Sequence, residues 1–330
     1  FYNCYNLDNV VLDSDNLTVI EKYSFANCNS LTTINLSLSI NKIEEYAFYH
    51  CCLNEITIPS AITEICDYAF AYNGKAKNVL INPDSWEITP SLKNIKFTEG
   101  TTIYRIGKYA FASNIIDELI LPDKELYLDE YCFTESNNIT SFNLKKEYTI
   151  TQGVIAFSNN LKKVYVSSTQ SLLSALGGNI LNVPNSLKEV EIIADSNEIL
   201  ANAFMGFGEV SKFIIPSTIT KIGDNAFYGC RSIESINIEN VTYIGANAFM
   251  ACHNLKDIKF SNKIDYIGGK AFNATEYFTS LENEEFVIID NILIKYNGDK
   301  QTVTLPDNVV AIAGGAFSGN HTINKIILNR

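Results

Sequence analysis

The sequence predicts a β-rich solenoid, in which short repeats stack on one another and share one continuous core. Three observations predict it: an alternating apolar pair that recurs at a nearly fixed interval, a phenylalanine that follows a small residue, and an apolar residue five positions before that phenylalanine. All three occur in Phe213–Phe260, where Phe213 recurs as Ile236 and again as Ile258. A fixed period of about 20–50 residues is typical of stacked-repeat proteins.

Phenylalanine marks one position in nearly every repeat, and we call these residues the marker phenylalanines. A large ring beside a small neighbour, once per turn, predicts a stack of rings through the core. An apolar anchor stands five positions before each marker; Gln152 breaks this column, and Ile150 is its substitute. The markers are Phe1, Phe25, Phe48, Phe70, Phe111, Phe133, Phe157, Phe204, Phe227, Phe249, Phe272 and Phe317. The anchors are Ile20, Ile43, Ile65, Ile106, Leu128, Ile199, Ile222, Ile244, Ile267 and Ile312.

Fourteen alternating apolar pairs lie on short runs rich in Ile and Val. Strict alternation over such a run predicts a strand with one buried face, and the period predicts one parallel strand per turn. Each turn also has room for a second extended segment around the anchor and a single helical turn at the marker. The pairs are Val10/Leu12, Ile34/Leu36, Ile56/Ile58, Val79/Ile81, Ile95/Phe97, Leu119/Leu121, Phe142/Leu144, Val164/Val166, Val190/Ile192, Phe213/Ile215, Ile236/Ile238, Ile258/Phe260, Val303/Leu305 and Ile326/Leu328.

Three intervals between markers depart from the period. The intervals from Phe70 to Phe111 and from Phe157 to Phe204 are each close to double the usual length, and each contains an additional apolar pair. We therefore expect one further turn in each, with a brief helix over 171–183 in the second. The third interval, from Phe272 to Phe317, contains two β-rich runs around Asp290-Asn291, which predict a hairpin over 286–296.

We expect residues 1–330 to form a single elongated, curved domain, because a solenoid is one continuous core however long it grows. Neither end of the sequence carries an obvious polar cap, although terminal repeats of solenoids usually need one. The sequence therefore indicates a fragment that is uncapped at both ends, and we expect flanking segments beyond it.

Composition excludes two classes of partner. The chain has 25 basic and 37 acidic residues and a net charge of −12, whereas nucleic-acid binding and polybasic membrane binding both depend on Lys and Arg. No apolar run approaches the roughly 18–20 residues that a membrane-spanning helix needs. We therefore expect no nucleic acid as a partner and no membrane-spanning segment.

The repeat resembles the BspA-like, Treponema-pallidum-type class of leucine-rich repeats. The resemblance rests on Ile222–Cys230 (IGDNAFYGC), Ile244–Phe249 (IGANAF), Ile106–Phe111 (IGKYAF) and Ile267–Phe272 (IGGKAF). It implies a right-handed leucine-rich-repeat solenoid in a secreted or surface-anchored protein of a bacterium or a protozoan parasite. Members of this class have been associated with adhesion to host proteins and to other cells. None of that activity maps to fixed residues, so the resemblance carries over no site.

The eight cysteines favour packing over chemistry. Cys4, Cys28, Cys51, Cys230 and Cys252 all fall three residues after a marker, and residues in step with a repeat behave as small buried hydrophobes. No C-x-x-C pair is present, which argues against zinc. A disulfide between neighbours, Cys28 with Cys51 or Cys230 with Cys252, is the alternative in an oxidising compartment.

Catalytic and metal-binding patterns are missing from the sequence. His50, His253 and His321 lie two to four residues after markers on distant turns, which predicts solvated turn residues. There is no H-E-x-x-H motif, no G-x-S-x-G motif and no phosphate-binding loop. We expect no enzyme, no metal and no cofactor.

Binding is the function class that remains, and the strand residues that face outward are its candidates. Most of them are polar or small, but Leu80, Ile120, Tyr165 and Ile214 are apolar or aromatic, and Trp86 is the single tryptophan. We expect these five residues to bind a protein partner, including host extracellular proteins, since exposed aromatic and apolar groups anchor interfaces. For Trp86, which lies in the irregular segment 82–90, the alternative is that it caps a local cluster. The leading hypothesis is a non-catalytic extracellular or cell-surface adhesion module. The alternatives are a spacer that displays another domain and a glycan-binding module, and isolated exposed apolar residues are also common without any function.

Overall fold

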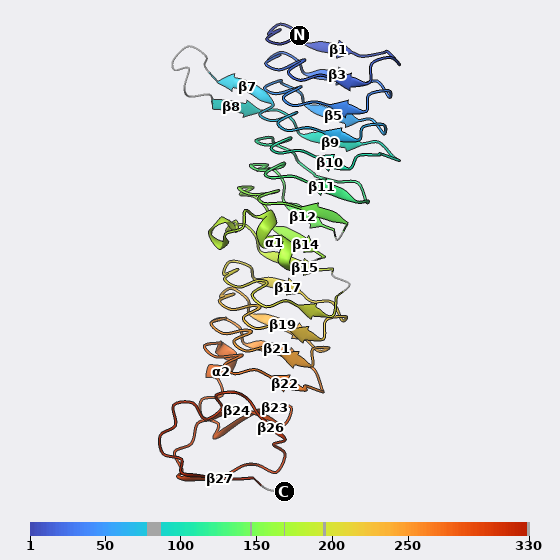
Figure 1. The fold of residues 1–330 in the computed structure, drawn as a ribbon. Coiled ribbons are helices and arrows are strands. Elements are labelled where there is room, and N and C mark those ends of the chain that lie inside the picture. Colours follow the sequence, from blue (N-terminus) through green and yellow to red (C-terminus); the bar gives the residue numbers. More distant parts are fainter. Residues whose placement is uncertain (78–86, 146, 168, 194–195, 329–330) are drawn as a thin grey trace. The chain divides into compact units, whose positions relative to one another are not determined.

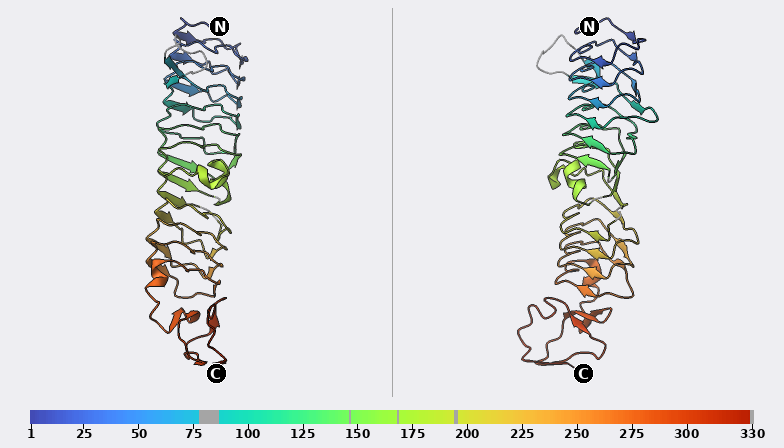
Figure 2. Two further views of the ribbon diagram at one scale, coloured as in Figure 1. Left: turned by 90° about the vertical axis from the view of Figure 1, so that its left-hand side faces the viewer. Right: turned by 45° about the vertical axis from the view of Figure 1, so that its right-hand side comes forward.

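The computed structural model describes residues 1–77, 87–145, 147–167, 169–193 and 196–328. The chain divides into two compact units, Phe1–Leu187 and Lys188–Arg330. Each unit is a β-solenoid in which successive turns contribute parallel strands (Figure 1). Two further views show regular stacked turns over most of each unit and a more irregular C-terminal end of the second unit (Figure 2).

The first unit has two sets of parallel strands. The apolar pairs form the longer strands, and the second extended segment predicted around each anchor is confirmed as a six-stranded parallel sheet. The longer strands pair as β1 (Asn9–Val11) with β3 (Thr33–Asn35), β5 (Glu55–Ile58) with β9 (Asn94–Phe97), and β12 (Ser141–Leu144) with β14 (Lys163–Val166). The anchor strands are β2 (Val19–Ile20), β4 (Lys42–Ile43), β6 (Glu64–Ile65), β10 (Arg105–Ile106), β11 (Leu126–Leu128) and β13 (Tyr148–Ile150).

The second unit repeats this arrangement and adds a hairpin. Its hairpin consists of β23 (Phe286–Ile289) and β24 (Ile292–Tyr296), which pair antiparallel around Asp290 and Asn291, as expected from the sequence. The longer strands pair as β15 (Glu189–Ile192) with β17 (Lys212–Ile214), β19 (Ser235–Ile238) with β21 (Asp257–Phe260), and β25 (Thr302–Thr304) with β27 (Lys325–Ile327). The anchor strands are β16 (Glu198–Ile199), β18 (Lys221–Ile222), β20 (Tyr243–Ile244), β22 (Tyr266–Ile267) and β26 (Ala311–Ile312), and a short helix α2 (Glu276–Thr279) follows β22.

Marker phenylalanines form the predicted column of stacked rings. In the first unit the rings from Phe1 to Phe133 stack at centroid distances of 5.0–5.4 Å and lie nearly parallel to one another. In the second unit Phe204, Phe227, Phe249 and Phe272 stack at 5.1–5.5 Å. Apart from Phe1, these rings are buried. The column is therefore the centre of each core.

The assignment of Phe157 to this column is wrong. Its side chain is 48% exposed, and Ile155 takes the buried position. The N–H of Phe133 donates to Val154 at 2.9 Å, as the N–H of Phe111 donates to Cys132 in the turn before. The five-residue spacing explains the difference, because Ile150 is the anchor of this turn and Ile155 stands five residues after it. Spacing from the anchor, rather than the aromatic ring, determines which residue is buried.

The additional turn expected between Phe70 and Phe111 is also wrong. Strand β5 pairs directly with β9, and the ring of Phe70 stacks on Phe111 at 5.1 Å. The intervening chain forms an antiparallel pair, β7 (Gly74–Lys77) with β8 (Glu87–Pro90), that projects from the stack of turns (Figure 1). The pair Val79/Ile81 lies outside the described residues.

In the other long interval, the expected turn with a brief helix is confirmed. The chain forms α1 (Thr169–Ala175) and a 3₁₀ helix at Ile180–Asn182. The N–H groups of Gly153 and Ile155 donate to Ser174 and Ala175 at 2.7 and 3.0 Å, so the end of α1 takes the place of the usual marker turn. The helix lies beside the strands (Figure 2).

Two predicted strand positions differ from the pattern. The pair Leu119/Leu121 forms no ladder; within the described chain only the bridge between Asn94 and Glu118 joins this segment to β9. Ile312, Ile326 and Leu328, which we expected in the core, are exposed. They lie in the last turns of the second unit, and no described turn packs on their far side.

Candidate interaction surface

The structure describes three of the five residues predicted to bind a partner. Leu80 and Trp86 lie outside the described residues. In the first unit Ile120 is 66% exposed and Tyr165 is half-buried, while Ile214 is half-buried in the second unit. Within the first unit, Tyr165 on β14 has Asn143 of β12 as its neighbour in the parallel register. Ile120 is therefore the apolar member of this set that is most available to a partner.

Ile120 stands at a groove where the sheet is interrupted. The groove has a volume of about 510 Å³ and lies between residues 97–101 and 120–124. The ammonium group of Lys124 donates to the carbonyl of Thr101 at 3.2 Å across it. The hydroxyl of Tyr148 donates to the carbonyl of Pro122 at 3.0 Å and holds the second segment. The groove exists because residues 119–121 do not continue the sheet beside β9.

Tyr165 is partly covered by its own strand. The ammonium group of Lys163 lies 4.4 Å from the centroid of the Tyr165 ring. A cation over the ring face stabilises this conformation and occupies the surface that a partner would contact. Tyr165 is therefore a weaker candidate than Ile120.

A second exposed feature, which the prediction did not include, is a stack of tyrosines two residues before successive markers. We call Tyr23, Tyr46, Tyr68, Tyr109 and Tyr131 the tyrosine ladder. Neighbouring rings stack at centroid distances of 4.8–5.2 Å with interplanar angles of 3–16°. The ladder ends at Gly153, which holds the same position in the next turn. A Cβ atom there would lie 2.3 Å from the ring of Tyr131, so a side chain does not fit beside that ring.

The ladder offers ring edges and hydroxyl groups to solvent. Tyr23 is 42% exposed and the other four side chains are half-buried. Among the described residues, no protein group is hydrogen-bonded to any of the five hydroxyls. Burial raises the pKa of Tyr46, Tyr68 and Tyr109 above the ordinary value, so these hydroxyls stay protonated and can donate at neutral pH.

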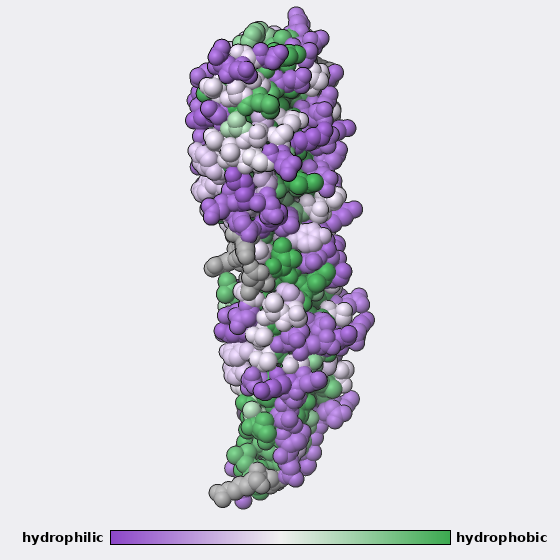
Figure 3. Space-filling model, turned by 90° about the vertical axis from the view of Figure 1, so that its right-hand side faces the viewer, coloured by the Kyte–Doolittle hydropathy of each residue, from purple (hydrophilic) through white to green (hydrophobic). Residues whose placement is uncertain are grey.

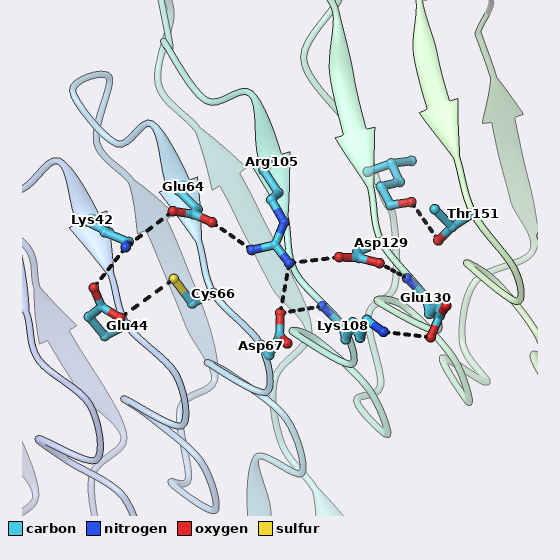
Figure 4. A network of polar contacts seen from close by, with 11 residues as sticks. Lys42, Glu44, Glu64, Cys66, Asp67, Arg105, Lys108, Asp129, Glu130 and Thr151 are labelled. Carbon is cyan, nitrogen blue, oxygen red and sulfur yellow. Dashed lines mark hydrogen bonds and ion pairs between the residues drawn. The ribbon is translucent and has the colours of Figure 1, made fainter.

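Beside the ladder, ion pairs join the anchor strands (Figure 4). The guanidinium of Arg105 on β10 contacts Glu64 at 2.6 Å, Asp67 at 3.1 Å and Asp129 at 2.7 Å. Burial opposes its charge, but hydrogen bonds to Asp129 and Glu64 outweigh burial and raise the pKa of Arg105. Lys108 pairs with Glu130 at 3.0 Å. The network links consecutive turns, and its four carboxylates outnumber its two cations, so this face keeps a net negative charge.

The cysteines have a structural role that packing alone does not describe. In four turns the thiol three residues after the marker donates to the marker carbonyl of the preceding turn. The four hydrogen bonds are Cys28 to Phe1 (3.2 Å), Cys51 to Phe25 (3.1 Å), Cys230 to Phe204 (3.2 Å) and Cys252 to Phe227 (3.0 Å). The amides of Asn73 and Asn114 make the same bond to Phe48 and Phe70. We call this position the donor column.

All eight thiols are free, and seven of them are buried. Neither disulfide considered from the sequence, Cys28 with Cys51 or Cys230 with Cys252, is formed. Burial raises the pKa of Cys252 to about 12 and raises that of Cys51 and Cys230 well above the ordinary value. Thiols with such a raised pKa carry almost no thiolate at neutral pH and are poor nucleophiles and metal ligands.

The donor column predicts a reciprocal pair of stability changes. Ser136 and Ser158 occupy the column, but their hydroxyls are buried without a hydrogen-bond partner. Replacing Ser136 with Cys is expected to raise the free energy of unfolding by about 1 kcal/mol, because the longer thiol can reach the carbonyl of Phe111. Replacing Cys51 with Ser is expected to lower it by about 1–2 kcal/mol. Urea unfolding measures both free energies. If both substitutions changed the free energy of unfolding in the same direction, the column would not act by hydrogen bonding.

The histidines differ from one another. His253 and His321 are exposed, as predicted for turn residues, but His50 is half-buried between Tyr49 and Tyr72, with ring centroids 4.3 and 5.6 Å away. Burial lowers the pKa of His50. In the part of the chain that the structure describes, no three His, Cys, Asp or Glu side chains could hold a metal ion together. Over the same residues, no helix is long and apolar enough to cross a membrane.

Comparison with known families matches nearly the whole chain. The model of the BspA type leucine-rich repeat region, with six copies, matches residues 1–91, 80–176 and 174–297. This chain belongs to the BspA type leucine-rich repeat family. The resemblance seen in the sequence and the predicted leucine-rich-repeat fold are both confirmed.

Solved structures similar to this BspA type chain are also leucine-rich repeat proteins. A leucine-rich repeat protein from Bacteroides ovatus is 18% identical, has a TM-score of 0.54, and is aligned over 100% of this chain and 86% of its own. One from Eubacterium ventriosum is 18% identical with a TM-score of 0.33, over 98% and 73% of the two chains. The pneumococcal vaccine antigen PcpA is 13% identical with a TM-score of 0.35, over 98% and 89%. No curated protein matches this chain.

Within this BspA type repeat, the residue columns divide into two classes. The markers, the anchors and the donor column lie inside each turn and determine the fold. The tyrosine ladder and the Ile120 groove lie outside and are not required by the repeat. The ladder can be seen in the sequence as a tyrosine two residues before five markers, a signal that a search restricted to the strand faces missed.

Proposed function

We propose that this chain is a non-catalytic, extracellular binding protein that presents the outward face of its first unit to a protein partner. The single observation that carries the proposal is the groove beside Ile120, where an exposed apolar side chain stands at an interruption of the sheet. Extracellular location is an expectation from the repeat family, whose members are secreted or surface-anchored.

The groove has the composition of a small protein-binding site. An exposed apolar group beside a concavity is where interfaces concentrate their binding energy. Glu99, Asp123 and Lys124 line the groove, and Asp123 already pairs with Lys145 at 3.0 Å, so Glu99 is the acidic group that a basic residue of a partner would complement. Apolar side chains on the face drawn in Figure 3 form small separate patches among polar ones. Such a surface fits a protein that binds a partner reversibly better than it fits an obligate interface.

Replacing Ile120 with Asp tests the site. Binding of the labelled chain to purified extracellular-matrix proteins is expected to weaken by about 10-fold or more, because a charge replaces the apolar anchor. The unfolding temperature is expected to stay unchanged, since the side chain is exposed.

Val11 gives the matched control. It is 61% exposed, as Ile120 is 66% exposed, but it lies on β1 and does not line the groove. Val11→Asp is expected to bind like the unmodified chain. Binding that survives Ile120→Asp would place the partner elsewhere, and equal loss in both variants would indicate a general charge effect.

A further inference from the structure

The tyrosine ladder occupies backbone positions that suit tyrosine poorly. Its five residues have φ between +53° and +60°, in the left-handed region where Asn is tolerated and bulky side chains are uncommon. In the second unit the same position carries Asn202, Asn225, Asn247 and Lys270, at φ of +54° to +61°. The repeat therefore folds without tyrosine here. Stacking of neighbouring rings stabilises the five tyrosines at this position, and their succession on one face makes the ladder a candidate for binding.

The chemistry that the ladder presents narrows the class of ligand. Its ring faces are covered by stacking, so a sugar ring or a nucleic-acid base, which binds on an open ring face, gains little there. Its hydroxyls can donate hydrogen bonds, and no described protein group uses them. Beside it Lys22 pairs with Glu45 and Lys108 with Glu130, while Arg105 contacts three carboxylates, so the surroundings are acidic. The ladder itself is an uncharged row of hydrogen-bond donors flanked by ring edges.

We propose that the tyrosine ladder binds a proline-rich segment of a partner protein in the polyproline II conformation. Such a segment has no internal hydrogen bonds, so its carbonyls are free to accept, and its prolines have no N–H to satisfy. An α-helix uses its carbonyls internally, and an added β-strand needs an open backbone edge that the tyrosine side chains do not provide.

Spacing supports the same ligand. One turn of polyproline II contains three residues and rises about 9.3 Å, close to the separation of about 10 Å between every second ring of the ladder. Equivalent carbonyls of successive ligand turns can therefore meet alternate tyrosines. Both partners are stiff before they meet, which lowers the entropic cost of binding. The inference goes beyond the proposed function, because it concerns the marker turns and does not depend on the Ile120 groove.

A labelled polyproline peptide long enough to span the ladder, about 20 Å, tests the proposal by fluorescence anisotropy with the full chain. We expect a saturable isotherm, and about a 10-fold or greater loss of affinity in the double variant Tyr68→Asn/Tyr109→Asn. The variant uses the residue that the second unit carries at the same φ, so it should still fold, with an unfolding temperature lowered by the lost ring stacks but well above the assay temperature. A Gly-Ser peptide of equal length should not bind.

Two further variants keep the result interpretable. Tyr68→Phe/Tyr109→Phe preserves the stacked rings and removes only two hydroxyls; it should bind several-fold more weakly, and full affinity would overturn the role of the donors. Tyr104→Asn/Tyr127→Asn removes two exposed tyrosines outside the ladder and should bind normally. The proposal is overturned if polyproline gives no saturable binding, if the Asn double variant binds like the unmodified chain, or if a β-linked oligosaccharide displaces the peptide and binds better.

Discussion

Replacing Phe111 with Ala is expected to lower the free energy of unfolding of the first unit by about 3–5 kcal/mol. The ring is fully buried and stacks on Phe70 at 5.1 Å and on Phe133 at 5.4 Å. Truncation leaves a cavity between two rings whose own positions are fixed by the backbone ladder, so the surrounding turns cannot close it. Urea or thermal unfolding followed by circular dichroism measures the loss.

Phe157 is the matched control for Phe111, since it is the same residue type in the same unit. Its ring is 48% exposed, so Phe157→Ala is expected to change the free energy of unfolding by less than about 1 kcal/mol. Ile155→Ala, which truncates the residue that replaces the marker in this turn, should cost about 2–5 kcal/mol. A larger loss for Phe157→Ala than for Ile155→Ala would show that the register of this turn is misassigned.

Replacing Arg105 with Gln is expected to lower the free energy of unfolding by about 2–3 kcal/mol. The guanidinium holds three carboxylates, and removing it leaves Asp129, whose side chain is only 9% exposed, without its compensating charge. The partial exposure of Glu64 and Asp67 reduces the effect below that of a fully buried pair. The loss should appear as a lower urea midpoint with an unchanged slope.

Lys96→Gln is the corresponding control, because Lys96 also pairs across turns, with Glu55 at 3.1 Å, but both side chains are more than half exposed. A surface pair of this kind contributes about 0–1 kcal/mol. If the two substitutions lowered the free energy of unfolding equally, the Arg105 network would contribute no more than an ordinary surface ion pair to the stability of the turns.

The period of the sequence was sufficient to predict the interior of the fold. Anchors such as Ile65 and Ile106 lie in paired strands because a parallel ladder repeats every backbone position once per turn. The error at Phe157 arose where two signals disagreed, the aromatic ring after a small residue and the five-residue spacing from Ile150. Backbone geometry fixes the spacing, whereas any apolar side chain of suitable size can fill the marker position.

The period of the sequence does not distinguish an inserted segment from an additional turn of the solenoid. The interval between Phe70 and Phe111 contains an apolar pair, Val79/Ile81, that imitates a strand of the repeat. The interval is nevertheless shorter than two full periods, and this shortfall was the available sign that the chain leaves the stack instead of completing a turn. Leu80 was assigned to the binding surface from that register; Leu80 and Trp86 both lie outside the described residues, so their role stays a prediction.

The candidate surfaces were predictable only in part. Ile120 is exposed as expected, because alternation along a strand determines which side chains point outward even where the ladder itself does not form. The tyrosine ladder was not predicted, because its residues lie in turns, where no alternation of apolar and polar residues indicates which side chains are exposed. The donor column could not be predicted from residue type. Cys51, Asn73 and Asn114 differ in type and share only the ability to donate a hydrogen bond.

The central claim, that this repeat chain is a binding protein, is tested most directly by an equilibrium binding isotherm. The full chain is titrated against a panel of immobilised extracellular-matrix proteins, and the bound fraction is measured by biolayer interferometry. The account predicts saturable binding to at least one of them, and weaker binding of Ile120→Asp than of Val11→Asp. Linear, non-saturating signals on every protein of the panel would contradict it and favour a spacer that only displays another domain.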